Sequence, residues 1–272
     1  MDRRPPRPLR IPKTLGIITF PDSEKVTLSP YNKVVQGLWV GNRLSAMEKL
    51  SIRSFLCNGH EFHLYVHGTC EGIPKGTVVK DANNIIDKSE ISGYLNLAVF
   101  SDMFRYTLLQ RKSPRWWVDL DTIALRPFEF QEDYVFASEY LQTGQCLVDN
   151  GILKVPKENH LIRLALDRCK LQDKAHPTGL LSHGALAMGP ELMTALAKEL
   201  DLLRYVKPPS VFTGIAPWDI PNAFIDPYVN LDLSQAHAVH MWQSRWTTTG
   251  QDKDEKYHPN SLYERLKQKY PE

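Results

Sequence analysis

The sequence predicts an α/β fold with a mainly parallel central sheet flanked by helices and a looped C-terminal portion. Two observations support this prediction. From about residue 33, short runs of β-branched and aromatic residues alternate with longer stretches of helical periodicity. A chain of 272 residues is long enough to bury a substantial core, and its composition, 42% hydrophobic and 24% charged, fits a soluble globular protein. No repeat or clear linker divides the chain, so we expect a single domain over residues 14–272.

The elements are expected in alternating order. Strands are predicted at residues 33–40, 62–66, 77–79, 115–120, 134–137 and 237–241, and an extended segment at 146–155. Helices are predicted at residues 44–57, 91–110, 157–171, 190–203 and 261–269. Ser45 with Glu48, and Ser261 with Glu264, have the spacing of capping boxes at the first and last helices. Residues 207–234 contain five prolines and are expected to form an irregular loop.

A basic, proline-rich tail is expected at residues 1–13. It contains the cations Arg3, Arg4, Arg7, Arg10 and Lys13. We favour a solvated, extended end for this segment. The alternative is peripheral contact with an anionic membrane surface, where each basic residue close to the lipid contributes about 1 kcal/mol.

The overall charge narrows the range of partners. The formal net charge is only +2, which removes the main argument for a nucleic-acid partner.

No apolar run reaches the roughly 18 residues of a membrane-spanning helix, and no apolar stretch follows the basic N-terminus as in a secretory signal. The four cysteines are sparse and form no C-x-x-C pair. These features predict a cytoplasmic protein with reduced thiols.

Two carboxylates follow an aromatic strand near the middle of the chain. Asp119 and Asp121 come directly after Trp116-Trp117-Val118, two residues apart, so a strand points both to one side. Carboxylates this close repel each other and need a cation. Oxygen ligands suit Mg²⁺ or Mn²⁺, ions that can offset charge on a departing phosphate. The alternative is a strand end that passes into a polar turn.

Three further segments contain candidate functional residues. Asp102 and Arg105 share a face of the helix expected at 91–110, either as an ion pair worth about 0.2–0.5 kcal/mol or as a grip on a polar ligand. Trp39 ends the first strand, where an indole either stacks on a nucleotide base or joins the core. His240 and Trp242 end a late strand, and a lone histidine there is more often structural.

Asp149-Asn150-Gly151 separates two apolar runs. Because Asn-Gly is a strong hairpin turn pattern, we expect a break in the extended segment at Asn150-Gly151. The alternative is functional, with Asp149 or Asn150 close to a transferred group.

Taken in order, these segments resemble the glycosyltransferases with a DXD sugar-binding motif, of the family-32 type. That group includes yeast mannosyltransferases, animal α-galactosyltransferases, bacterial polysaccharide enzymes and the catalytic core of the large clostridial glucosylating toxins. The matching segments are residues 38–41 (LWVG), 101–106 (SDMFRY), 117–121 (WVDLD), 149–153 (DNGIL), 189–192 (GPEL) and 238–242 (AVHMW). The resemblance spans about residues 33–246, and the SD-x-x-R and DXD pair is its most specific part.

The resemblance implies a GT-A (Rossmann-like) fold, a nucleotide-sugar donor, and Mn²⁺ or Mg²⁺ as cofactor. Carried over, Trp39 would stack on the uracil of a UDP-sugar, and Asp102 would contact the sugar hydroxyls. Arg105 would contact the donor phosphate or sugar, and Asn150 would lie near the donor sugar.

The metal set implied by the resemblance is Asp119, Asp121 and His240, and Trp242 would contact the donor. Asp119 would also face the ribose or sugar, and His240 would reach either the metal or the diphosphate. The group commonly has Asn-Asn where this chain has Asp149-Asn150, which leaves the role of Asp149 open between nucleophile and orientation of the acceptor.

The function implied by the resemblance is metal-dependent, retaining transfer of a hexose to a saccharide or lipid-linked saccharide acceptor in surface polysaccharide synthesis. By position alone, residues 207–234 are the expected acceptor region. Two other functions stay open at this point. One is glycosylation of a protein, as by the toxins; the other is binding of a nucleotide sugar without catalysis.

Overall fold

The computed structural model describes residues 14–22, 26–94, 96–111, 116–175 and 185–272. The expected basic tail, with Arg3, Arg4, Arg7 and Arg10, lies outside the described residues. Within the described part, every helix is too short or too polar to cross a membrane.

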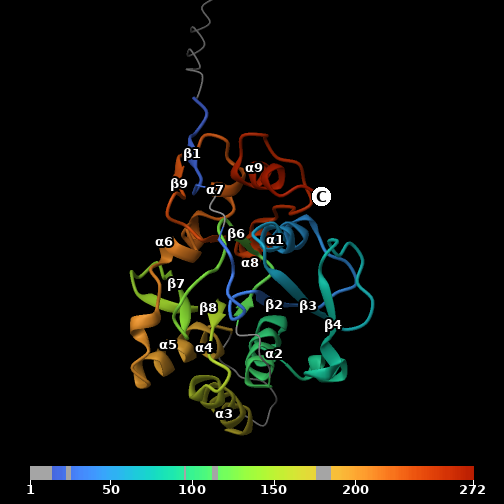
Figure 1. The fold of residues 1–272 in the computed structure, drawn as a ribbon, viewed down its shortest axis with the longest axis vertical. Coiled ribbons are helices and arrows are strands. Elements are labelled where there is room, and N and C mark those ends of the chain that lie inside the picture. Colours follow the sequence, from blue (N-terminus) through green and yellow to red (C-terminus); the bar gives the residue numbers. More distant parts are fainter. Residues whose placement is uncertain (1–13, 23–25, 95, 112–115, 176–184) are drawn as a thin grey trace, which may run out of the picture.

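A six-stranded sheet crosses the middle of the molecule (Figure 1). Its strands, in spatial order, are β4 (Val78–Asp81), β3 (Glu61–Val66), β2 (Val34–Trp39), β5 (Trp116–Val118), β8 (Cys146–Lys154) and β7 (Val135–Tyr140). The pairings from β4 to β5 are parallel, but β8 runs antiparallel to both β5 and β7. The fold is therefore α/β as predicted, with a mixed sheet where we expected a mainly parallel one.

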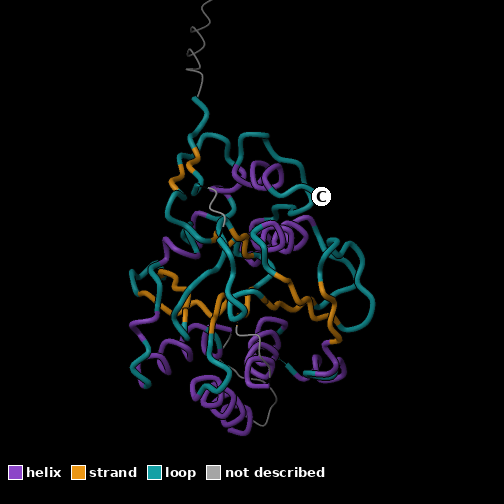
Figure 2. The backbone as a smooth tube through the Cα atoms, in the orientation of Figure 1, coloured by secondary structure: helices purple, strands orange, loops and turns teal. Residues whose placement is uncertain are grey.

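Helices cover both faces of this sheet (Figure 2). One face packs on α2 (Leu97–Arg111), α3 (His160–Ala175), α4 (Ala185–Met188) and α5 (Pro190–Glu199). The other face packs on α1 (Ala46–Cys57), and large aromatic side chains such as Trp116 and Phe128 fill the space between. Burial of these apolar surfaces is the main force that holds the layers together.

A second, smaller layer packs on α1 and extends from the level of that helix to the top of Figure 1. It consists of an antiparallel pair, β6 (Thr122–Ala124) with β10 (Ala238–His240), a short parallel pair, β1 (Ile18–Thr19) with β9 (Leu231–Asp232), and the helices α7 (Asn222–Ile225), α8 (Gln243–Thr249) and α9 (Leu262–Lys269). Because β6 follows directly on β5, this layer brings β10 next to the carboxyl end of the central strand.

The first helix begins as the sequence predicts. The Ser45 side chain accepts from the backbone of the first turn, and Glu48 Oε2 accepts from Ser45 N at 2.7 Å. This reciprocal pairing satisfies donors that a helix start leaves unpaired. At α9, Ser261 Oγ likewise accepts from Glu264 N, whereas the Glu264 carboxylate turns to Tyr257 and Lys267.

Several element boundaries differ from the prediction. The helix expected from residue 91 begins at Leu97, after a separate 3₁₀ segment at Lys88–Gly93. The helix expected at 190–203 ends at Glu199. Residues 207–234 form short ordered elements, α6 (Pro209–Phe212), η4 (Pro217–Asp219), α7 and β9, and not one continuous irregular loop.

The break expected at Asn150-Gly151 is absent, and β8 continues through both residues. Phe136 pairs with Leu153 and the next residue, Ala137, pairs with Asp149. Residues 150–152 of β8 are therefore bulged against β7, and the local bend re-aims their side chains. The Asn-Gly pair thus serves a bulge, and the hairpin interpretation was wrong. β8 pairs with β5 from Ile152 to Lys154, and Gly151 O still accepts from Asp119 N just after β5.

Candidate active site

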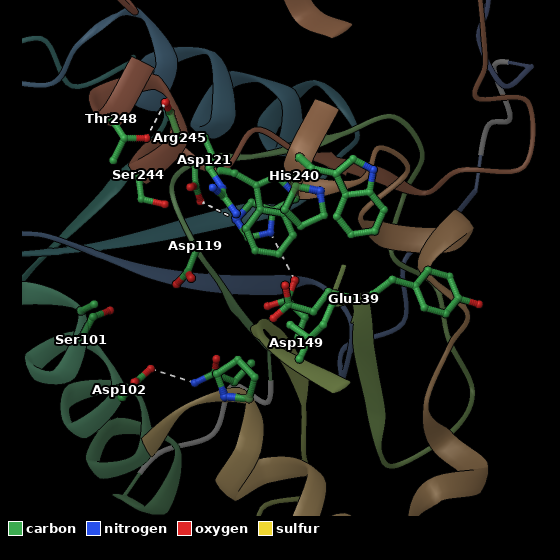
Figure 3. Close-up of a pocket in the computed structure, with 18 of the residues that line it drawn as sticks. Ser101, Asp102, Asp119, Asp121, Glu139, Asp149, His240, Ser244, Arg245 and Thr248 are labelled. Atoms are coloured by element: carbon green, nitrogen blue, oxygen red, sulfur yellow. Dashed lines mark hydrogen bonds and ion pairs between the residues drawn. The ribbon is translucent and has the colours of Figure 1, made fainter. Parts of the chain in front are cut away.

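A cavity of about 660 Å³ opens at the carboxyl end of β5, where the chain leaves the sheet toward β6 (Figure 3). It is lined by Ala98, Ser101, Asp102, Arg105, Asp119, Asp121, Glu139, Tyr140, Leu141, Gln142, Asp149, Asn150, Pro190, Pro217, Trp218, His240, Trp242, Ser244, Arg245 and Thr248. All the predicted site residues except Trp39 therefore lie in one cavity. The carboxyl edge of an α/β sheet is where such folds bind ligands.

Arg105 lies beneath the cavity between two carboxylates. Its Nη1 donates to Asp102 Oδ1 at 2.8 Å and its Nη2 to Asp119 Oδ1 at 2.7 Å. The side chain is only 3% exposed and packs over the Trp117 ring. Its Nε has no partner within the described part of the chain. The guanidinium therefore holds Asp102 on α2 and Asp119 after β5 in one arrangement.

Asp102 is also tied to β8. Asn150 Nδ2 donates to Asp102 Oδ1 at 2.7 Å and lies 3.1 Å from the hydroxyl of Tyr106, which donates to Met188 O. Burial raises the pKa of Asp102 to about 7, although Arg105 and Asn150 act in the opposite direction. The bulge in β8 thus places Asn150 beside Asp102 on α2, a residue that the sequence assigned to the same candidate site.

Asp119 and Asp121 do not share a partner. Asp119 Oδ1 also accepts from Trp117 Nε1 at 2.8 Å, whereas Asp121 Oδ2 accepts from Gln243 N at 2.8 Å. Burial raises the pKa of Asp119. Burial would also raise that of Asp121, but the charge and hydrogen bond of His240 and the Gln243 amide lower it to about 2. Asp121 is therefore an ionised carboxylate at the cavity wall.

His240 bridges two carboxylates from opposite sides of the site. Its Nε2 lies 3.1 Å from Asp121 Oδ1 and its Nδ1 lies 3.2 Å from Asp149 Oδ2. Burial disfavours the imidazolium, yet the two carboxylates raise the pKa of His240 well above its usual value. The Trp242 ring stacks on the imidazole at 4.0 Å between centroids, with Trp242 itself in the left-handed backbone region.

Gly151 lies where these groups converge. A Cβ atom there would lie 3.0 Å from both Asp119 Oδ2 and Asp149 Oδ1, and 3.4 Å from the His240 ring. Gly151 O also accepts from Asp119 N at 2.8 Å. Only glycine leaves room for the two carboxylates and the imidazole to approach one point.

Two charged residues of the cavity were missed by the sequence analysis. Glu139 on β7 is 5% exposed and faces the same space as Asp149 (Figure 3). Burial and the nearby Asp149 charge raise the pKa of Glu139 to about 7. Arg245 on α8 lines the opposite wall. The predicted strand ended at residue 137, whereas β7 continues to Tyr140. Because residues two apart on a strand point to the same face, a longer predicted strand would have placed Glu139 on the face of Ala137.

Trp39 lies outside the lining of this cavity. Its Nε1 donates to Arg43 O at 3.0 Å, and the Lys253 ammonium lies 5.3 Å from its ring. The partly buried indole packs against the core cluster between the sheet and α1. Its stacking on a base stays a prediction.

The donor chemistry of the site fits a hard divalent cation. Asp119 Oδ2 has no donor within the described part of the chain, and Asp121 is held ionised beside it in the lining. Carboxylate oxygens are the ligands that Mg²⁺ and Mn²⁺ prefer. In the described ranges, however, no three His, Cys, Asp or Glu side chains are already grouped as a set of metal ligands.

Comparison with known proteins adds nothing to this geometry: no protein-family model and no curated protein matches the chain.

Proposed function

We propose that this chain is a metal-dependent, retaining glycosyltransferase of the GT-A type. It would move a hexose from a nucleotide sugar, with a UDP-sugar favoured, to a saccharide or lipid-linked saccharide acceptor in surface polysaccharide synthesis. One observation carries the proposal. Four segments far apart in the sequence, at residues 102–105, 119–121, 149–151 and 240–242, converge on one cavity at the carboxyl end of β5.

The charges of the cavity suit a diphosphate donor with its cation. Asp119, Asp121 and His240 would hold Mn²⁺ or Mg²⁺, and such an ion offsets the charge that develops on a departing diphosphate. Asp121 and Asp149 raise the pKa of His240, so a bound cation would take the place of the proton on this side chain, because histidine ligates through its neutral imidazole. Arg245 adds a cation to the wall at α8. These groups support a donor that carries negative charge.

The polar residues beneath the cavity suit a sugar. Asp102 and Asn150 are bonded to each other, and both line the cavity. Because both terminal nitrogens of Arg105 are already engaged with carboxylates, we assign it the role of holding Asp102 and Asp119 in position. Glu139 and Asp102 each have a pKa of about 7, so each carboxyl group is able to take up or release a proton near neutral pH.

The test is thermal stabilisation by nucleotide diphosphates, with and without Mn²⁺, on the wild type and on Asp119→Ala/Asp121→Ala. A ligand at one hundred times its dissociation constant adds about 2.7 kcal/mol of stability. We expect uridine diphosphate to stabilise the wild type only with Mn²⁺, and the double variant to lose this effect. Glu61→Ala/Glu158→Ala is the matched control, since it removes two exposed carboxylates outside the cavity.

A positive result would be followed by hydrolysis assays with a panel of UDP-sugars. If guanosine diphosphate stabilises the protein in place of uridine diphosphate, the reaction type stands and the donor changes. If no nucleotide stabilises it and no nucleotide sugar is consumed with Mn²⁺, including by water, the proposal is wrong.

A further inference from the structure

A second cavity, of about 460 Å³, borders the first. Trp218 lines both cavities, so this residue lies where they meet. The residue lies in η4, where buried Pro217 anchors the backbone and Asp219 N donates to Ala216 O at 3.0 Å. The indole is 41% exposed on this anchored segment. Both volumes fall within the range of about 300–1,000 Å³ typical of small-molecule sites.

The second cavity has a different chemistry from the first. Its polar side chains are Asp219, Asn222 and Asn230, all exposed, and the described lining contains no Lys, Arg or His. Asn230 Oδ1 accepts from Ile17 N at 2.8 Å, which directs the Nδ2 donor of this amide away from that bond. A wall without cations does not attract phosphate, whereas amide donors and a carboxylate acceptor suit hydroxyl groups.

The combination of an exposed aromatic face with hydrogen-bonding side chains suits a neutral ring that has an apolar face and a polar edge. A sugar ring has this property, and Trp supplies a large apolar surface with few rotatable bonds. Tyr140, 48% exposed, offers a second ring in the lining of the first cavity. An acceptor that lies across Trp218 would have one sugar at the reacting carboxylates and the next in the second cavity.

We propose that the 460 Å³ cavity is a subsite for an uncharged oligosaccharide acceptor of two or more sugars, with the Trp218 indole as its stacking platform. The proposal deepens the proposed function, on which it rests for the identity of the ligand as an acceptor. Its prediction is a dependence on chain length, because a single sugar fills only the first cavity.

The probe is an array of immobilised neutral glycans of one to six units of glucose, galactose, mannose and N-acetylglucosamine. We expect the wild type to bind at least one oligosaccharide more tightly than its monosaccharide. Trp218→Ala should weaken that binding by about tenfold or more, which corresponds to about 1.4 kcal/mol, and Trp218→Phe should weaken it less. Asn222→Ala should reduce the preference for the longer chain. Tyr31→Ala, which removes an exposed ring outside both cavities, should change nothing.

Thermal melting of each unliganded variant reports whether the fold persists, and the uridine diphosphate shift on the same samples separates the two proposals. If the wild type shows the nucleotide shift but binds no glycan, or binds equally with and without Trp218, the subsite is wrong and the transferase proposal stands. If Trp218→Ala instead turns a dimer into a monomer in light scattering, Trp218 is a protein contact and the subsite is likewise wrong. If glycans bind through Trp218 without any nucleotide shift, the glycan site stands and the proposed reaction fails.

Discussion

Removal of Arg105 should destabilise the fold as well as the site. The guanidinium is 3% exposed, and the two carboxylates it holds, on Asp102 and Asp119, have side chains that are 7% and 28% exposed. In Arg105→Met the apolar stem of the side chain is kept, while the charge and both hydrogen bonds are lost. The variant therefore leaves two carboxylates in and beside the core without their cation.

The size of the effect follows from the distances. At 2.8 and 2.7 Å, each ion pair is worth about 6 kcal/mol of attraction at an effective dielectric constant of about 20. Most of this attraction is offset by the cost of taking the three charges out of water. Removing one partner from a buried pair typically costs about 3–5 kcal/mol, and we expect Arg105→Met to lie in this range.

The assay is urea unfolding of the wild type, Arg105→Met, Asp102→Asn and the double variant. Because Asp102→Asn removes one of the stranded charges, the cycle should give a coupling energy above about 1.5 kcal/mol. Arg168→Met is the matched control, since its ion pair with Glu199 is 39% and 48% exposed and should contribute less than about 1 kcal/mol. A loss below about 1 kcal/mol for Arg105→Met, with no coupling to Asp102, would refute this role for the guanidinium.

Three further outcomes are expected. Burial lowers the pKa of His60 to about 4, so between about pH 6.5 and about pH 4 the unfolded state binds a proton that the folded state does not. The free energy of unfolding of the wild type should therefore drop by about 3 kcal/mol as the pH falls through this range. Urea melts recorded at each pH should show a smaller drop for His60→Gln. Gly151→Ala should cost about 1–3 kcal/mol in urea melts and abolish the uridine diphosphate shift, because its methyl group displaces the carboxylates, whereas Gly93→Ala, with no neighbour within 4 Å, should do neither. Glu48→Ala should lower the free energy of unfolding by about 2–3 kcal/mol in the same assay, because it removes the reciprocal cap and leaves Lys253 without its ion-pair partner. An unchanged urea midpoint would contradict this role of Glu48.

The sequence contained enough information to group most of the site. Asp119 and Asp121 follow a strand whose three residues are fully buried, and the spacing of Asp102 and Arg105 on a helix was correct. The strand rule did not apply to Asp119 and Asp121, because β5 ends at Val118 and the chain passes into the turn that was the alternative interpretation. The helix rule acts over a few residues, where backbone geometry alone decides which side chains share a face. Such local rules also gave the capping box at Ser45 and the late strand that ends at His240.

The features that were missed depend on pairing between distant segments. The Asn150-Gly151 pair has the local pattern of a turn, and only the neighbouring strands turn it into a bulge. Ala137 pairs with Asp149, which places Glu139, two residues further along β7, on the same face of the sheet as Asp149. A strand prediction from one sequence does not fix this register. Trp39 was grouped with the site because it ends a strand of the same sheet, yet its indole packs toward α1 and Lys253.

The one strand that departs from the predicted parallel sheet accounts for how the site is assembled. β8 runs antiparallel across the end of β5, so Gly151 O meets Asp119 N directly and the bulge directs Asn150 to Asp102. A parallel neighbour would instead present the carboxyl end of its own strand, followed by a loop, at this edge. By carrying Asp149 and Asn150 on a strand that is paired on both sides, the mixed sheet fixes the positions of both side chains. Such preorganisation lowers the entropic cost of binding at any site that uses these side chains.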